Sequence, residues 1–280
     1  MKKIRLTQAE LSRLVEYPNV FLSTESKIYY YKRNLLLKKL YLTDAKTIDR
    51  KVYTLETINN SPLVEFEELV IPEKLAIAGG KNIGFTIQEV KGKTLQEILY
   101  SEIPTKDKID LLKKVGEVLR KIESCDQEFY FNDLQGYNII VDNNGELRFI
   151  DLDSSSVNKD DAVQSYYLNT DRKVVNMNKY RFNAHGIPYP DTNNDLLSYS
   201  TMILNTIADF KTGRLSISDY YNYLSYLDDI GFDDELLDIF VNLYTEKENV
   251  NPVDYLDTLK GNDLEKAKYI RYKALKKKYY

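Results

Sequence analysis

Residues 131–153, with the sequence FNDLQGYNIIVDNNGELRFIDLD, constrain the fold of this chain more than any other stretch. Two short runs with alternating apolar and β-branched residues flank an Asn144-Gly145 turn. An Asn-Gly turn between such runs is among the strongest local signals for a β-hairpin. Asp133 and Asn138 precede the first run, and Asp151 ends the second. Because antiparallel pairing brings these positions to the same end of the hairpin, we expect the three polar side chains to converge there.

This set of side chains has two interpretations. Carboxylate and carboxamide oxygens suit a hard cation such as Mg²⁺, which uses few protein ligands together with substrate phosphates. The alternative is a surface hairpin in which the Asp and Asn residues only stabilise turns, because both residue types are common in turns.

The loop and hairpin resemble the catalytic loop and metal-binding motif of the eukaryotic-like protein kinases. In that family an H-R-D-x-x-x-x-N loop precedes a D-F-G motif, and Asp133, Asn138 and Asp151 align with its three polar residues. The resemblance implies that Asp133 is the catalytic base and that Asn138 and Asp151 bind Mg²⁺ in the presence of ATP. It also implies an α+β, bilobal protein kinase-like fold, with a small antiparallel β-sheet lobe in residues 1–90 and a larger, mostly helical lobe in residues 91–280.

Four residues depart from the family pattern. Phe131 and Asn132 replace the His and Arg, Gln135 stands where many protein kinases have Lys, and Asp153 replaces the last Gly of D-F-G. Gln135 and the D-x-D ending resemble the aminoglycoside and choline phosphotransferase branch of the same fold. Because a bidentate guanidinium is the group that pairs well with phosphate, the loss of the Arg argues against regulation by activation-loop phosphorylation.

The N-terminal part contains β-strand patterns after a short helix expected in residues 7–15, which Thr7 and Glu10 would cap. We expect three strands, in residues 19–24, 27–33 and 34–42. The third strand resembles the V-A-I-K strand of kinases, which implies that Lys38 binds the ATP phosphates; a surface Lys on an edge strand is the alternative. The first turn has no glycine, although the family covers the phosphates with a Gly-rich loop. Its small residues are Ser23, Thr24 and Ser26.

A helix is expected from Thr43 or Asp44 to about residue 59, because apolar residues recur at helical spacing. In the kinase family a Glu of this helix pairs with the strand Lys. We assign this role to Glu56, with Asp49 as the competing choice and a solvent-exposed Glu as the alternative.

The next segments resemble the last strand, hinge and first large-lobe helix of a kinase. LVIPEKLAIA and IGFTIQEV predict a hairpin across a glycine-containing turn, and KGKTLQEIL follows. The resemblance implies that adenine contacts backbone groups of Glu89 and Lys91, beside Gln88.

The C-terminal part is predicted to be mostly helical, beginning with a long helix in residues 107–124. The polar residues 154–194 resemble an activation and substrate-binding segment, with a disordered insertion as the alternative. Asp195 and Ser198 resemble the D-x-W-S-L-G helix, whose Asp accepts backbone hydrogen bonds from the catalytic loop; a simple N-cap is the alternative. Further helices are expected in residues 216–229, 233–246, 252–259 and 262–278.

Composition excludes several classes of protein. The single cysteine, Cys125, excludes an intramolecular disulfide framework, and the single histidine, His185, excludes a His-based zinc site. The chain has no run of ~20 apolar residues and no secretory signal pattern, so we expect no membrane span and a cytoplasmic location. The net charge of −4 argues against general nucleic-acid binding.

The last fifteen residues carry seven Lys or Arg and no acidic residue. This tail could contact nucleic acid, an anionic membrane or an acidic partner. The interpretation we favour is a basic helix end, which the helix dipole stabilises.

These patterns together predict an atypical, ATP- and Mg²⁺-dependent kinase that phosphorylates a protein Ser or Thr. One alternative keeps the chemistry and changes the acceptor to a small-molecule alcohol. The other is a pseudokinase that serves as a binding scaffold, which the absent glycines and the replaced His and Arg suggest.

Overall fold

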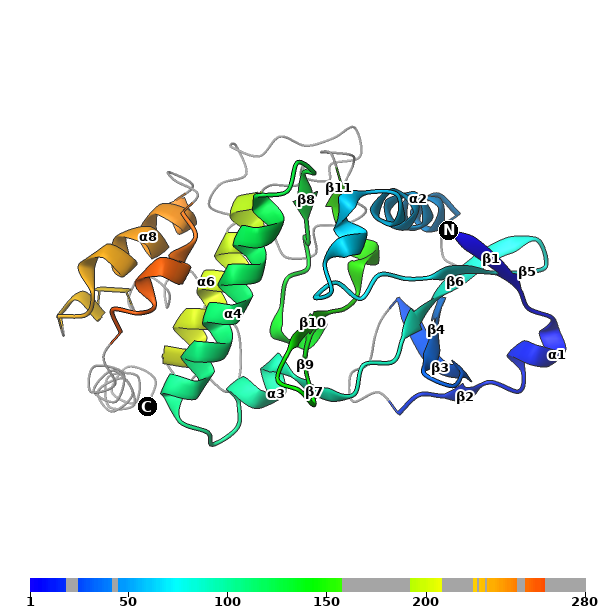
Figure 1. Cartoon of the computed structure of the whole chain (residues 1–280), viewed down its shortest axis with the longest axis horizontal. Coiled ribbons are helices and arrows are strands. Elements are labelled where there is room, and N and C mark those ends of the chain that lie inside the picture. Colours follow the sequence, from blue (N-terminus) through cyan, green and yellow to red (C-terminus); the bar gives the residue numbers. More distant parts are fainter. Residues whose placement is uncertain are drawn as a thin grey trace, which may run out of the picture.

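The computed structural model describes residues 1–18, 25–41, 45–157, 192–207, 224–225, 227–229, 231–245 and 250–259. They form a mixed α+β structure, as predicted. In Figure 1 the six-stranded sheet and helix α2 (Ala45–Asn59) gather at one end, and helices α4 (Thr105–Glu123), α6 (Thr192–Ile207) and α8 (Asp234–Thr245) lie at the other. Within the described residues, no helix is both long enough and apolar enough to cross a membrane.

The six-stranded sheet has the order β1-β5-β6-β4-β3-β2. Its strands are β1 (Lys2–Arg5), β2 (Val15–Glu16), β3 (Ser26–Lys32), β4 (Leu35–Leu40), β5 (Lys74–Ala78) and β6 (Lys81–Gln88). All neighbouring pairs are antiparallel except β1 and β5, which are parallel. The strands predicted in residues 27–33 and 34–42 are confirmed as β3 and β4, and the predicted hairpin is β5–β6. The strand predicted in residues 19–24 lies outside the described residues.

The two faces of the sheet are covered by different parts of the chain. Leu37, Ala76 and Ile83 pack with Leu6 and with partly buried residues around α1 (Gln8–Leu11). The opposite face belongs to the main core, because Leu40, Leu75 and Phe85 cluster with buried residues of α2, including Leu55 and Ile58. Since successive strand residues point to opposite faces, Lys38 lies between Leu37 and Lys39 with its side chain on the α2 side.

The predicted N-terminal helix is shorter than expected. Both hydrogen bonds of the capping box between Thr7 and Glu10 are present, but the helix ends at Leu11. The prediction that it extends to residue 15 is wrong, because Val15 belongs to strand β2 and pairs with Tyr30 of β3. Strand pairing therefore overrides the local helical pattern.

The helical part is built around α4 and α6, which lie side by side in Figure 1. The hydroxyl of the buried Tyr199 on α6 donates a hydrogen bond of 2.7 Å to the carbonyl oxygen of Leu112 on α4. The helix predicted in residues 107–124 is α4, and the one predicted in residues 233–246 is α8.

The other helix predictions have mixed outcomes. In residues 252–259 the chain forms only a short 3₁₀ helix, η4 (Pro252–Tyr255), where a longer helix was predicted. Of the helix predicted in residues 216–229, only residues 224–225 and 227–229 are described, and they are helical. The helix predicted in residues 262–278 and the basic tail lie outside the described residues.

Gly116 of α4 faces α6 and η4 at close range, and Gly116→Ala is therefore expected to destabilise the protein. A Cβ atom at this position would lie 2.4 Å from the Tyr199 hydroxyl oxygen and 2.6 Å from Cβ of Val253. Overpacking of this kind costs about 1–3 kcal/mol, which outweighs the ~1 kcal/mol that alanine gains in a helix. Urea unfolding would measure the loss. Glu117→Ala, at an exposed position of the same helix, is the control; equal free energies of unfolding for the two variants would contradict the prediction.

Candidate functional site

The predicted hairpin is present and holds the polar loop at one end. Strands β9 (Ile139–Asp142) and β10 (Leu147–Phe149) pair antiparallel, with β7 (Gly92–Thr94) on the other side of β9. The carboxylate of Asp142 accepts the backbone N–H groups of Asn144 and Glu146 at 2.8 and 3.0 Å, which stabilises the turn. At the opposite end, the N–H of Ile150 donates to the carbonyl oxygen of Asn138 at 2.8 Å. This bond brings Asn138 next to Asp151, as predicted.

The carboxylate of Asp133 is held by two amide side chains. Asn138 Nδ2 donates to Asp133 Oδ2 at 3.0 Å and to the Asp133 carbonyl oxygen at 2.9 Å. Gln135 Nε2 donates to Asp133 Oδ1 at 2.9 Å. Each carboxylate oxygen thus accepts one hydrogen bond, which fixes the orientation of the carboxylate in the loop.

Two residues of this site have left-handed backbone conformations. Asp151 has φ = 65° and Asn132 has φ = 57°. Such angles are uncommon outside glycine and concentrate at functional sites. Asn132 is tied to the segment that follows β10, because its Nδ2 donates to the Ser154 carbonyl oxygen at 3.0 Å and to Ser156 Oγ at 2.7 Å. The loop before the hairpin and the segment after it are therefore joined.

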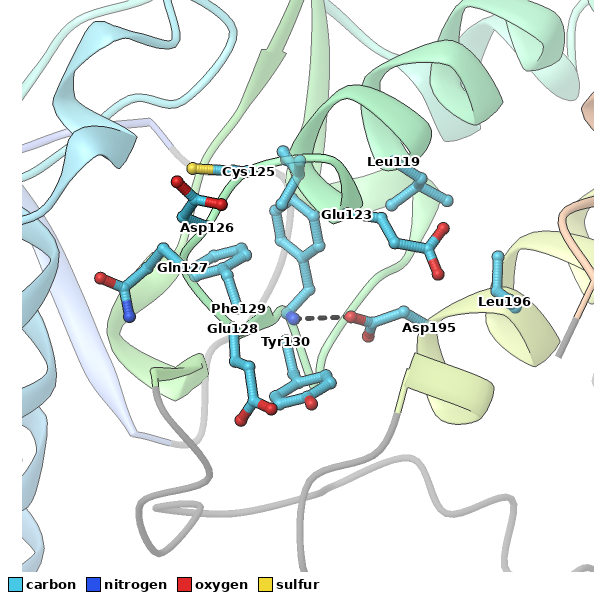
Figure 2. Close-up of a pocket in the computed structure, with 12 residues that line it drawn as sticks. Leu119, Glu123, Cys125, Asp126, Gln127, Glu128, Phe129, Tyr130, Asp195 and Leu196 are labelled. Carbon is cyan, nitrogen blue, oxygen red and sulfur yellow. Dashed lines mark hydrogen bonds between the residues drawn. The ribbon is translucent and has the colours of Figure 1, made fainter.

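Asp195 anchors the loop from helix α6. Its Oδ2 accepts the N–H of Phe131 at 2.7 Å, the dashed line in Figure 2, and its Oδ1 accepts the N–H of Asn132 at 3.0 Å. This is the contact that the sequence predicted. The N-cap alternative does not hold, because α6 already begins at Thr192. Asp195 and Cys125 are also among the residues that line a pocket of about 200 Å³; Figure 2 shows how the residues around this pocket lie.

Lys38 reaches the same site from strand β4. Its Nζ forms ion pairs with Asp151 Oδ1 and, at 2.6 Å, with Asp153 Oδ1. Lys38 and Asp153 are buried, while about a third of the Asp151 side chain is exposed, at 33%. The structure therefore brings together Lys38, Asp133, Asn138 and Asp151, although 113 residues separate Lys38 from Asp151.

Glu56 does not pair with Lys38, so this part of the prediction is wrong. Its carboxylate lies 3.8 Å from the terminal ammonium of Met1. Asp49, the competing choice, is exposed on α2. The residue of α2 that reaches the site is Lys51, and at 100° per residue Glu56 lies about 140° around the helix from it.

The sequence-based prediction missed both Lys51 and the role of Asp153. Lys51 Nζ lies 2.7 Å from Asp153 Oδ2 and 3.2 Å from Glu25 Oε2. A signal was present, because residues 48, 51, 55 and 58 follow helical spacing and the other three are apolar. A Lys within an apolar stripe implies a buried partner for its charge.

The residues predicted to contact adenine lie at the end of β6 and directly after it. Gln88, Glu89 and Lys91 line a pocket of about 690 Å³ together with Arg148 and the turn of the β9–β10 hairpin. The N–H of Glu89 donates to the carbonyl oxygen of Asn34 at 2.9 Å, so this group already has a partner within the protein. Leu36 pairs with Ile87, on the face of Lys38. The side chain of Gln88, one residue later, consequently points to the other face of the sheet.

Burial and neighbouring charges shift the pKa values at the site. Burial and the negative charge of Asp151 raise the pKa of Asp133 to about 7, although the hydrogen bond from Asn138 opposes the shift. Burial also raises the pKa of Asp151, against the effect of Lys38. Burial acts in the same direction on Asp153, but Lys38 and Lys51 outweigh it and hold the pKa of Asp153 well below its usual range. Burial favours neutral forms of the two lysines, yet the acids raise the pKa of both, so both stay charged.

The raised pKa of Asp133 predicts a pH dependence of stability. An acid whose pKa is higher in the folded than in the unfolded state binds more protons when folded. Its ionisation therefore costs stability, and this cost grows as the pH rises from the ordinary value of 3.8 to about 7. We expect the unliganded wild type to lose about 3 kcal/mol relative to Asp133→Asn between pH 5 and 8. Urea unfolding of both proteins across this range is the measurement, and parallel pH profiles would contradict the expectation.

Asn138 and Asp151 offer oxygen ligands of the kind that Mg²⁺ takes when a nucleotide supplies the rest. Among the described residues, no group of three or more His, Cys, Asp or Glu could hold a metal ion. Asn138 uses Nδ2 to bind Asp133, so Oδ1 is the side-chain atom that it has left to offer to a cation. One carboxylate and one carboxamide are the small protein contribution that Mg²⁺ takes when phosphates and water supply its other ligands.

No protein-family model matches the chain, and no curated protein matches it. A function for this chain therefore has to be inferred from its own residues.

Proposed function

We propose that this chain is an atypical kinase that transfers the γ-phosphoryl group of ATP to a Ser or Thr hydroxyl of a protein. One observation carries the proposal: four polar side chains from different elements meet in one site. They are Lys38 of strand β4, Asp133 of the loop, and Asn138 and Asp151 at the open end of the hairpin. A cation, a positioned carboxylate and a pair of metal-binding side chains are the components that phosphoryl transfer requires.

The order of elements supports a bilobal, protein kinase-like fold. In the small lobe, residues 1–90, strands β3 and β4 precede α2, and the β5–β6 hairpin follows. In the large lobe, residues 91–280, α3 (Leu95–Leu99) and α4 precede the loop and the β9–β10 hairpin, and α6 anchors the loop. These are the elements that the resemblance implies on either side of a nucleotide site.

Each residue of the site has a chemical task in this proposal. Asp133 accepts the proton of the attacking hydroxyl, and a pKa near the working pH suits a general base. Lys38 neutralises negative charge on the phosphates. Asn138 and Asp151 would hold Mg²⁺, which would neutralise charge at the transferred group. In the unliganded protein Lys38 contacts Asp151, so nucleotide binding requires Lys38 to move from Asp151 to the phosphates.

A small-molecule alcohol is the second candidate acceptor, and one contact favours it. Gln135 donates to Asp133, where many protein kinases have a Lys. The protein acceptor is favoured by residues 154–194, which are long enough to form a substrate-binding segment, and by the anchoring of the loop through Asp195. Most of that segment, including His185, lies outside the described residues.

Nucleotide binding and the fate of the γ-phosphate test the proposal. Mg-ATP is expected to raise the melting temperature, and labelled phosphate is expected to enter the chain itself or a generic protein. Labelling of a panel of alcohols without labelling of protein would favour the second candidate. A thermal shift without any turnover would identify a nucleotide-binding pseudokinase. The absence of both the thermal shift and turnover would overturn the proposal of a kinase for either acceptor.

A further inference from the structure

Three buried charged side chains form a continuous chain of ion pairs between separate segments. Asp153 lies in the short 3₁₀ helix η3 (Leu152–Ser154), between Lys38 of β4 and Lys51 of α2. Its Oδ1 is 2.6 Å from Lys38 Nζ, and its Oδ2 is 2.7 Å from Lys51 Nζ. Each oxygen of one carboxylate therefore binds its own ammonium group.

The burial of these groups makes their pairing consequential. Asp153 is 0% exposed, and the side chains of Lys51 and Lys38 are 3% and 8% exposed. Removing one partner of a buried ion pair strongly destabilises the folded protein, because water cannot reach the remaining charge to replace the lost interaction. With Lys51 removed, the carboxylate of Asp153 would bind Lys38 alone and be free to reorient toward it.

We propose that Lys51 and Asp153 are positioning residues for Lys38: Lys51 fixes the carboxylate of Asp153, and Asp153 holds the Lys38 ammonium in place when a nucleotide draws it away from Asp151. This inference rests on the proposed function. It reverses the charge arrangement that the kinase resemblance implies, in which an acid on the helix holds the strand lysine. Here the helix supplies a cation, and the acid comes from the segment after β10.

Further contacts of Lys51 extend the same connection. Its Nζ is 3.2 Å from Oε2 of Glu25, the residue before β3, and 3.5 Å from Ser154 Oγ. Lys51 thus connects α2 with the start of β3 and with η3. Because Asp153 is only two residues after Asp151, the position of α2 is coupled both to the phosphate-binding lysine and to the candidate metal ligand.

A double-mutant cycle on Lys51 and Asp153 tests this inference. The variants are Lys51→Met, Asp153→Asn and the double variant, with Lys51→Arg as the charge-conserving change. Lys121→Met is the matched control, since Lys121 pairs with Glu68 on the surface, away from the site. Calorimetry gives the Kd for Mg-ATP at a temperature at which every variant is folded, and steady-state kinetics gives KM and kcat.

Lys51→Met is expected to raise the Kd and the KM for ATP about tenfold, the scale on which supporting residues tune a neighbouring ligand, with a smaller effect on kcat. Lys51→Arg, which conserves the charge, is expected to bind Mg-ATP nearly as tightly as wild type. The double variant is expected to bind no more weakly than Asp153→Asn alone, because Lys51 acts through Asp153. Should Lys51→Met not fold, Lys51→Gln, which retains a donor for Asp153, is measured in the same way.

The outcomes separate this inference from the proposed function. If wild type does not bind Mg-ATP, the proposed function fails, and the positioning role fails with it. If wild type binds Mg-ATP but Lys51→Met, or Lys51→Gln in its place, binds equally tightly, the positioning role is overturned while the proposed function stands. A lower melting temperature with an unchanged Kd would show a purely structural ion pair and would overturn the inference, as would additive losses in the double variant.

Discussion

Asp133→Asn is expected to lower the rate of phosphoryl transfer about 10²–10⁴-fold, the usual contribution of a positioned general base. Asn has the shape of Asp but cannot accept the hydroxyl proton. Asn keeps one acceptor oxygen for the Asn138 amide. Its NH2 group faces Gln135, whose side-chain amide can turn its oxygen toward this new donor, so we expect the loop to keep its conformation. The Kd for Mg-ATP is expected to stay close to that of wild type, because Lys38 and Asp151 are unchanged.

Single-turnover measurement of phosphate transfer, together with calorimetric measurement of the Kd, would check this expectation. Asp110→Asn is the matched control, since Asp110 is a half-exposed residue of α4 that lies 3.7 Å from Lys113 and away from the site. Transfer by Asp133→Asn at the wild-type rate would remove Asp133 from the proposed chemistry.

Asp151→Asn is expected to reduce Mg²⁺-dependent transfer by about 10³-fold, because it removes the charged member of the cation-binding pair. The fold is expected to survive this change. Lys38 remains buried beside Asp153, whose carboxylate still neutralises it at 2.6 Å. The substitution therefore leaves no unpaired buried charge.

The binding signature of Asp151→Asn differs from that of Asp133→Asn. We expect Mg²⁺ to strengthen ATP binding by wild type and by Asp133→Asn, and this strengthening to be lost in Asp151→Asn. Calorimetric titrations with ATP, with and without Mg²⁺, measure the difference, and circular dichroism checks the fold. Transfer by Asp151→Asn equal to that of wild type would show that the site is assigned wrongly.

Local sequence patterns predicted the hairpin and the residues at its end. The Asn144-Gly145 turn and the alternating strands specify the register of β9 and β10 within a few residues of chain. Asn138 lies directly before β9, Asp133 lies in the loop that leads to it, and Asp151 lies two residues after β10, so their convergence follows from local geometry. The partners of Asp195 in the loop lie 63 and 64 residues away in the sequence, too far for local patterns to connect them. This contact was therefore predicted from the resemblance alone.

The partners of Lys38 could not be predicted in the same way. Sequence spacing shows that α2 is a helix, but the docked helix decides which of its charged residues faces the sheet. Docking directs Lys51 inward, leaves Asp49 exposed and places Glu56 near Met1. The helix could therefore not supply the acid that the resemblance implies, and Asp153 takes that place.

The sequence by itself determined the α+β class, the hairpin and the positions of the polar residues around it. These features depend on turn chemistry and residue alternation, which act over a few residues. Only the tertiary structure decided that Lys38, Asp153 and Lys51 form one buried chain of charges. Ion pairing depends on distance and burial between segments about 100 residues apart, and neither is encoded in the local pattern of any one segment.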